Sequence, residues 1–97
     1  MDTSSTENRL MQTSCLLKAL SNEKRLMIVC NLREGELCVG ALEEIVDLSQ
    51  SALSQHLARL RRDGIVKTRR EAQTIFYSLA CEETMKLLDY LCDIDQI

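Results

Sequence analysis

The feature that most constrains the fold is a change in hydrophobic periodicity at Gly64. Before this glycine, apolar residues recur at intervals of three and four, the spacing of helices that bury one face. After it, apolar and polar residues alternate as far as Leu79, the spacing of half-buried strands. A helical repeat then resumes at Glu82. The order predicts a set of helices, a β-hairpin and a closing helix.

Capping residues and glycines divide the chain into elements. Ser21-Asn22 can begin a helix, and Gly35 and Gly64 can each end one. The link Glu71-Ala72-Gln73 contains neither Gly nor Asn, so we expect a loop wider than a two-residue turn between the strands. The predicted elements are helices over 8–20, 23–32, 39–46 and 50–63, strands over 65–70 and 74–79, and a helix over 82–94.

Two short helices, over 39–46 and 50–63, are joined by a tight turn and followed by a basic hairpin. This order is typical of a winged helix-turn-helix fold, which is mainly α with a small β-hairpin. We expect a single domain of this class over residues 8–97 and a disordered polar tail over residues 1–7.

The net charge of −3 conceals a basic stretch. Between Arg59 and Arg70, six basic residues stand against Asp63 alone, which gives +5 there and −8 over the rest of the chain. A positive stripe on an acidic body attracts a phosphate backbone from one side. A solvated helix face is the alternative interpretation of such a run. Its location on the second helix of the pair and on the hairpin favours nucleic acid.

The helix over 50–63 has two opposite faces. Leu53, Leu57 and Leu60 share one side and should anchor the helix to the core. The other side is small and polar at its start and cationic at its end, which suits close approach to bases and phosphates. This outer side and its flanks carry Ser51, Ser54, Gln55, Ala58, Arg59 and Arg62.

Neighbouring residues extend the predicted DNA-reading surface. Ser49 can cap the helix, whose N-terminal N–H groups then suit a phosphate. Arg69 and Arg70 add charge on the hairpin. His56 lies between the two faces of the helix, where it either packs beside the helix or contacts DNA.

Cysteine usage and the absence of catalytic motifs exclude several classes of protein. Five cysteines at irregular spacing, with no C-x-x-C pair and no Cys/His cluster, predict neither a disulfide scaffold nor a structural zinc site. No nucleophile–base pair or phosphate loop is visible, so we expect no enzyme and no cofactor. We find no secretory signal and no apolar run of bilayer length, and therefore expect a cytoplasmic protein without membrane contact.

A resemblance to the ArsR/SmtB family of winged-helix repressors is carried from Leu48 to Leu79 by LSQSALSQHLARLRRDGIVKTRREAQTIFYSL. Two further segments, LLKALSNEKRLMIVCNL and GELCVGAL, fit the same family, and its persulfide- and redox-sensing branch most of all. The resemblance implies a homodimer, formed by the first and last helices, that binds an imperfect inverted repeat in double-stranded DNA until an inducer releases it. It also implies DNA contacts at Gln50, Ser51, Ser54, Gln55, His56, Arg69, Arg70 and Gln73.

The same branch suggests which thiols respond to an inducer. It carries one reactive cysteine in the second helix and a partner near the end of the last. Cys30, in MIVCNL, matches the first, and Cys92, in YLCDI, resembles the second but stands about one turn earlier. The resemblance implies that reactive sulfur species or oxidants link the two thiols and change DNA affinity. A cysteine on an apolar helix stripe is otherwise a small core residue. We expect Cys15 and Cys81 to be structural, with Cys15 near the dimer interface.

Cys38 is the alternative reactive thiol, at the predicted start of the helix over 39–46. Its segment ELCVG resembles the metalloid-binding E-L-C-V-C of arsenic-sensing relatives, but Gly40 replaces the second cysteine, and one thiolate is too few for As(III). The last helix has no His for a zinc site, so we expect no bound metal. A metal- or metalloid-responsive repressor and a winged-helix protein-interaction module are the alternative functions; the basic stripe argues against the second.

Overall fold

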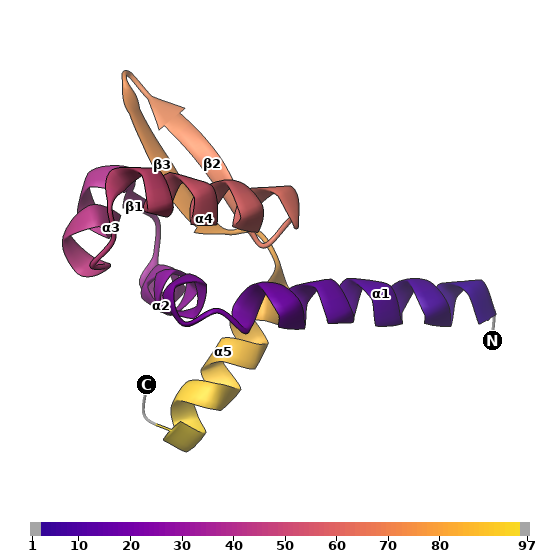
Figure 1. The fold of residues 1–97 in the computed structure, drawn as a ribbon. Helices are drawn as coiled ribbons and strands as arrows, with labels where there is room; N and C mark the ends of the chain where they lie inside the picture. Colours follow the sequence, from indigo (N-terminus) through magenta and orange to yellow (C-terminus); the bar gives the residue numbers. More distant parts are fainter. Residues whose placement is uncertain (1–2, 96–97) are drawn as a thin grey trace.

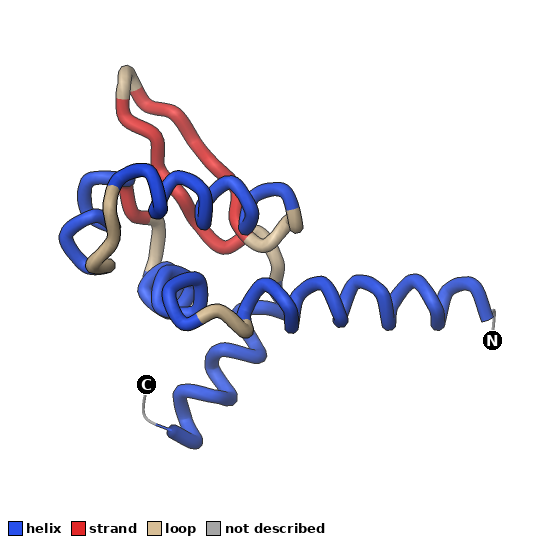
Figure 2. Tube along the Cα trace, in the orientation of Figure 1, coloured by secondary structure: helices blue, strands red, loops and turns tan. Residues whose placement is uncertain are grey.

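The computed structural model describes residues 3–95 and has the predicted winged helix-turn-helix architecture (Figures 1 and 2). Helix α1 extends away from the body, and the β2–β3 hairpin rises past α4 to form the wing. The elements in chain order are α1 (Thr3–Leu20), α2 (Glu23–Asn31), the 3-10 turn η1 (Leu32–Glu34), β1 (Leu37–Cys38), α3 (Val39–Ile45), α4 (Gln50–Arg62), β2 (Val66–Glu71), β3 (Thr74–Leu79) and α5 (Glu82–Asp95).

The start of the first helix was predicted too late. Residues 3–7 continue α1, because no Gly or Pro interrupts the sequence between Thr3 and Leu20. Residues 1–2 of the predicted tail lie outside the described residues. The starts of α2, α3, α4 and α5 agree with the sequence prediction to within one residue. The ends of the five predicted elements after Gly35, which are α3, α4, β2, β3 and α5, agree equally well.

The sheet has one strand more than predicted. β1 pairs antiparallel with β3 through Leu37↔Tyr77 and Cys38↔Phe76, so the strand order is β1-β3-β2. A two-residue strand has no periodicity of its own, and only its partner far along the chain reveals it. The pairing joins the segment that begins the helix-turn-helix directly to the wing.

The wing turn is tighter than predicted. Glu71 pairs with Thr74, which leaves Ala72 and Gln73 as a two-residue turn in place of the expected wider loop. Ala72 has φ 55°, a backbone region that glycine usually supplies. The ladder pairs every residue from Val66 to Glu71, so the strands are held in register up to the turn and the alanine accepts the strained conformation.

The core lies between the sheet and the helices. Its buried apolar residues come from every helix and from β2: Ala19, Leu20, Ile28, Val29, Leu32, Leu42, Val46, Leu53, Leu57, Leu60, Ile65, Val66 and Leu88. By contrast, α1 reaches this core only through its last turns, and its earlier apolar side chains Leu10, Met11 and Leu17 are 65%, 67% and 54% exposed. Within residues 3–95, no helix has both the length and the apolar character to cross a membrane.

Asn22 fixes the junction between α1 and α2. Its extended backbone places the Oδ1 atom where it accepts hydrogen bonds from the backbone N–H groups of Lys24 (2.9 Å) and Arg25 (3.0 Å). Two otherwise unsatisfied donors of α2 are thereby paired. The predicted cap is confirmed.

We expect Asn22→Ala to lower the free energy of unfolding by about 1 kcal/mol, the usual cost of losing a side-chain N-cap. Urea denaturation followed by circular dichroism measures the change. Asn22→Asp keeps an acceptor in the same place and should unfold close to wild type. An alanine variant as stable as the wild type would show that the cap contributes nothing.

Candidate nucleic-acid interface

Helix α4 is held to the body along one side only. Leu53, Leu57 and Leu60 are at most 2% exposed, as the spacing predicted. Ser49 caps the helix by accepting a hydrogen bond from the Ala52 N–H at 3.1 Å. The helix is therefore fixed in both rotation and starting point, so its outer side chains are presented in a defined order.

The outer side of α4 faces solvent. This side carries the helix residues that were predicted to contact DNA. Its exposed residues are Gln50, Ser51, Ser54, Gln55, Ala58 and Arg62. The residues are small over the first two turns and cationic over the last. A helix of this kind can enter a groove, because short side chains let its backbone come close while arginine reaches bases or phosphates.

Two hollows flank this outer side. One, of about 480 Å³, lies between α4 and the wing, and includes Ser54, Arg61 and Tyr77 in its lining. The other, of about 490 Å³, lies between α4 and α2, and is lined by Arg25, Gln55, His56, Ala58, Arg59 and Arg62. Ala58 and Arg62 line both hollows, so they form the ridge between them. With a hollow on each side, α4 can project into a groove of DNA.

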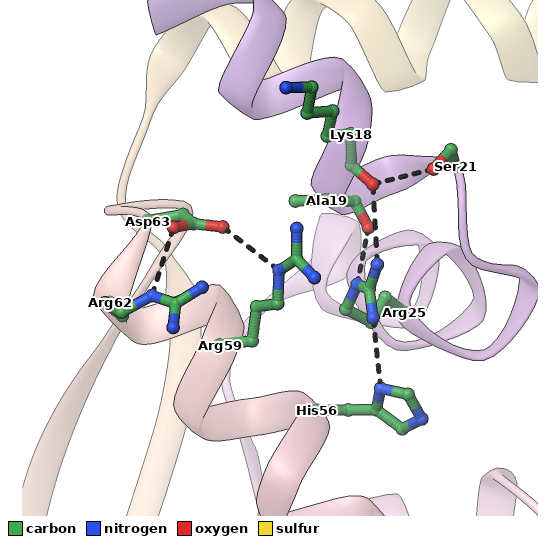
Figure 3. Close-up of polar contacts among 8 residues, drawn as sticks. All are labelled: Lys18, Ala19, Ser21, Arg25, His56, Arg59, Arg62 and Asp63. Carbon is green, nitrogen blue, oxygen red and sulfur yellow. Dashed lines mark hydrogen bonds and ion pairs between the residues drawn. The ribbon is translucent and has the colours of Figure 1, made fainter.

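Arg25 connects α1, α2 and α4 (Figure 3). Its Nε atom donates to the Ala19 carbonyl at 2.7 Å and its Nη2 atom to the Lys18 carbonyl at 3.4 Å. Its Nη1 atom lies 3.5 Å from Nδ1 of His56 on α4. Partial burial, with the charge of Arg59 as a second cause, lowers the Arg25 pKa. Sequence reasoning missed this role of Arg25, because the contact to His56 joins residues 31 positions apart.

His56 is half-buried beside α2, which fits the packing alternative for this residue better than base contact. Burial, and then the neighbouring Arg25 charge, lower the His56 pKa below its ordinary value of 6.5. The ring is consequently neutral near pH 7, and its Nδ1 atom can accept from the guanidinium.

Asp63 holds two of the basic side chains at the end of α4. Its carboxylate oxygens lie 3.5 Å from Nε of Arg59 and 3.5 Å from Nε of Arg62 (Figure 3). Both separations are those of loose ion pairs rather than hydrogen bonds, and the buried Nε of Arg59 has no hydrogen-bond partner among the described residues. Loose pairs leave both guanidinium groups available to a phosphate. Arg61, which lines the hollow beside the wing, was counted in the basic stripe but not among the predicted contacts.

The two arginines of the wing lie on opposite faces of the hairpin. Successive strand residues alternate in direction, so Arg70 shares the face of Thr68 and its partner Tyr77, the face that looks toward α4. Arg69 shares the other face with its partner Phe76, and its guanidinium carbon lies 4.6 Å from that ring centre. The tip residue Gln73 is exposed.

Arg69 is bound within the chain. Its Nε atom donates to Glu36 Oε2 at 3.1 Å, its Nη2 atom donates to Oε1 of the same carboxylate, and its Nη1 atom donates to Glu71 at 2.9 Å. The hydrogen bonds from Arg69 lower the Glu36 pKa, and the two carboxylates raise the Arg69 pKa. Arg69 was predicted to contribute positive charge to DNA contact, but its guanidinium is already paired with the carboxylates of Glu36 and Glu71.

The cysteines form no disulfide among those whose side chains are described, which are Cys15, Cys30, Cys38 and Cys81. Cys30 is half-buried against the core, and Cys38 stands at the start of α3, as predicted, without a side-chain cap bond. Cys92 lies in α5, but its side chain is outside the described residues. No group of three or more His, Cys, Asp and Glu side chains that could hold a metal ion occurs in the part of the chain described.

An ion pair connects the end of α2 to α5. Arg33, in η1, donates from Nε and Nη2 to Oδ1 of Asp89 at 3.0 and 2.7 Å. Arg33 follows Cys30 by three residues, and Asp89 precedes Cys92 by three. The ion pair thus ties the 3-10 turn that follows the Cys30 helix to the helix that carries Cys92, three residues from each cysteine in the sequence.

Comparison with known proteins places this geometry in a family. The sequence profile of bacterial regulatory proteins of the arsR family matches residues 22–68. The transcriptional activator HlyU of Vibrio cholerae is 58% identical over 76 residues, which are 78% of this chain and 70% of that protein. The biofilm growth-associated repressor of Agrobacterium fabrum is 47% identical over 85 residues, covering 88% of this chain and 73% of that protein.

Two solved structures have the same fold. Reduced HlyU from Vibrio cholerae superimposes with a TM-score of 0.87 at 49% identity, covering 94% of this chain and 96% of that one. The homodimeric winged helix-turn-helix DNA-binding domain of Mb0332 from Mycobacterium bovis, a possible ArsR-family transcriptional regulator, gives 0.85 at 27% identity, covering 98% of this chain and 88% of that one.

The neutral His56 makes stability depend on pH. Because its pKa is lower in the folded state, the unfolded chain binds more protons as pH falls below about 6.5, and this contribution to stability is lost toward acid pH. We expect the wild type to lose more free energy of unfolding between pH 7.5 and 5.5 than His56→Gln does, as measured in urea. Equal losses in the two proteins would contradict the assignment.

Proposed function

Since the chain belongs to the arsR family of bacterial regulatory proteins, we propose that it is a homodimeric repressor that binds operator DNA through α4 and the wing. The observation that carries the proposal is that α4 buries a leucine side in the core and exposes Ser, Gln and Arg residues on the opposite side. A purely structural helix of this length would be expected to expose an ordinary charged face, without the adjoining basic wing.

The proposed DNA-binding surface has three parts. The outer side of α4 enters the major groove, where Gln55 can pair with a base edge and Arg62 with guanine or phosphate. The capped N-terminus of the helix presents its N–H groups to the phosphate backbone. Arg70, on the wing face nearest α4, reaches the adjoining backbone. In this arrangement the short side chains of Ser51, Ser54 and Ala58 let the helix backbone come close to the DNA, and they contribute no charge.

The exposed apolar side of α1 supports a dimer. An 18-residue helix that packs only through its end is marginal in water on its own. Leu10, Met11 and Leu17 on α1, and Tyr90 on α5, are more than half exposed in one chain and would be covered by a second copy. Two copies related by a twofold axis present two α4 helices, which suits an inverted repeat with half-sites about one helical turn apart.

We assign the switch to cysteine thiols. The contact of Arg33 with Asp89 supports a link between Cys30 and Cys92, because it ties the turn three residues after Cys30 to α5 three residues before Cys92. A Cys30 thiolate attacks the outer sulfur of a hydropersulfide, giving a Cys30 persulfide and releasing the donor's thiol. Cys92 then attacks the inner sulfur, so that a disulfide forms and H₂S leaves. The cysteines are oxidised by two electrons and the sulfane sulfur is reduced by two.

Joining α2 to α5 would act on both parts of the proposed function. α5 belongs to the proposed dimer surface, and α2 contacts α4 through Arg25 and His56. A covalent link between them would therefore change the relation of the two α4 helices in the dimer. A spacing suited to successive major grooves would be lost, and the repressor would leave its operator.

Removal of an outer cation tests DNA reading. We expect Arg62→Ala to weaken operator binding by about 1–3 kcal/mol, roughly 5- to 150-fold, while the dimer stays folded. Fluorescence anisotropy with duplexes selected from random sequence measures the affinity, and sedimentation measures the assembly. Lys24→Ala, a cation of α2 that lines neither hollow beside α4, is the matched control and should bind normally. Undiminished affinity in Arg62→Ala would remove this side of α4 from the proposed interface.

Replacement of the proposed sensor tests the switch. We expect Cys30→Ser to remain on DNA when a sulfane sulfur donor releases the wild type, because no persulfide can form at that position. Cys81→Ser should respond like the wild type, and mass spectrometry of the treated wild type should show Cys30 linked to Cys92. Release of Cys30→Ser at wild-type donor concentrations, or release lost only in Cys38→Ser, would assign the chemistry elsewhere. As(III) in parallel distinguishes the metalloid alternative.

A further inference from the structure

Arg69 crosses the whole three-stranded sheet. It starts on β2 at one edge, passes over Phe76 on the central strand β3, and reaches Glu36, which precedes β1 at the other edge. The register confirms this path, because Arg69 pairs with Phe76 and Phe76 pairs with Cys38. Glu36 stands two residues before Cys38, so the guanidinium crosses one face of the sheet on a diagonal and ties β2 to the start of β1. We call Arg69, Phe76 and Glu36 the sheet clamp.

The sheet clamp lies at the short strand pairing that joins the wing to the segment directly before α3. β1 pairs with β3 through two residues only, whereas β2 and β3 pair through six. α3 begins at Val39, directly after β1. Any contact that fixes β1 against the hairpin also fixes the angle between the wing and the helix-turn-helix.

The charges around Arg69 argue against a direct contact with DNA. Two carboxylates, Glu36 and Glu71, already bind its guanidinium. Turning Arg69 toward a phosphate would leave both acids unpaired beside a polyanion, an arrangement that costs free energy. Arg70 lies on the opposite face, toward α4, and forms no ion pair with any residue in the described range 3–95.

We propose that Arg69 is a positioning residue for DNA recognition, which holds the wing at the angle at which Arg70 reaches the DNA backbone. The inference rests on the proposed function, and it divides the two neighbouring arginines of the wing by role. Arg70 contributes charge to the complex. Arg69 contributes geometry, through the sheet clamp.

Glu36→Gln tests the proposal by the sign of its effect. Removal of a negative charge near the wing should tighten DNA binding if electrostatic attraction alone matters. If the sheet clamp positions the wing, the same change weakens binding, by about three- to fivefold, the change that one exposed ion pair supports. Glu71→Gln removes the same charge without releasing β1 and is the matched control, expected to bind at least as well as wild type. Unchanged or tighter binding by Glu36→Gln overturns the proposal.

Salt dependence separates the two arginines. We expect Arg70→Gln to reduce the slope of log affinity against log salt by about 0.9, the value for one lost phosphate contact. Arg69→Gln should weaken binding with the slope unchanged. Arg69→Lys, which keeps the charge but not the planar fork that binds Glu36, should weaken binding almost as much. Wild-type affinity in Arg69→Lys, or a smaller slope in Arg69→Gln, identifies Arg69 as a phosphate contact and overturns the proposal.

Hydrogen exchange tests the clamp without DNA. In the intact dimer, the backbone amides of the β1–β3 ladder should exchange several-fold faster in Glu36→Gln than in Glu71→Gln or wild type. Equal exchange rates in all three would overturn the proposal even if DNA binding changed. If the wild type bound no duplex at all, the proposed function would fail, whereas this measurement would still decide whether Arg69 fixes the wing.

Discussion

The packing of Leu53, Leu57 and Leu60 into the core is the interaction on which the rest of the account depends. Three side chains spaced by four and three residues fix both the height and the rotation of α4 on the body. With height and rotation fixed, the residues on the opposite side of the helix, Ser54, Gln55, Ala58 and Arg62, face solvent. Burial of a fully enclosed leucine contributes about 1.5–3 kcal/mol, far more than any exposed ion pair in the interface, so apolar packing sets the geometry that the charges then use.

The basic stripe of the sequence is divided by the fold into groups with different roles. Asp63 holds Arg59 and Arg62 loosely at the end of α4, and the sheet clamp holds Arg69 tightly on the outer face of the wing. The positive charge that faces the DNA is therefore smaller than the local net charge of +5 counted between Arg59 and Arg70. Orientation accounts for the difference, because strand residues one position apart face opposite sides of a sheet.

The sequence predicted the parts of this molecule that depend on local periodicity, and missed those that depend on distant partners. The leucine spacing of α4 and the capping role of Asn22 follow from neighbouring residues, and both are confirmed. β1 has only two residues, and its pairing with β3 cannot be read from them. The contacts of Arg25 with His56 and of Arg69 with Glu36 likewise join residues more than 30 positions apart. The tight turn at Ala72 was missed because the hydrogen-bonded pairing of β2 with β3 sets it, although alanine disfavours a positive φ.

Methylation interference on the operator tests the central claim most directly. Methylation of guanine at N7 lies in the major groove and that of adenine at N3 in the minor groove, so the two modifications report which groove a protein enters. The account predicts that N7 methylation blocks binding in two patches whose centres lie about one helical turn apart, and that Arg62→Ala loses sensitivity at part of each patch. Interference confined to the minor groove, or N7 sensitivity identical in Arg62→Ala and wild type, would contradict the placement of α4 in the major groove.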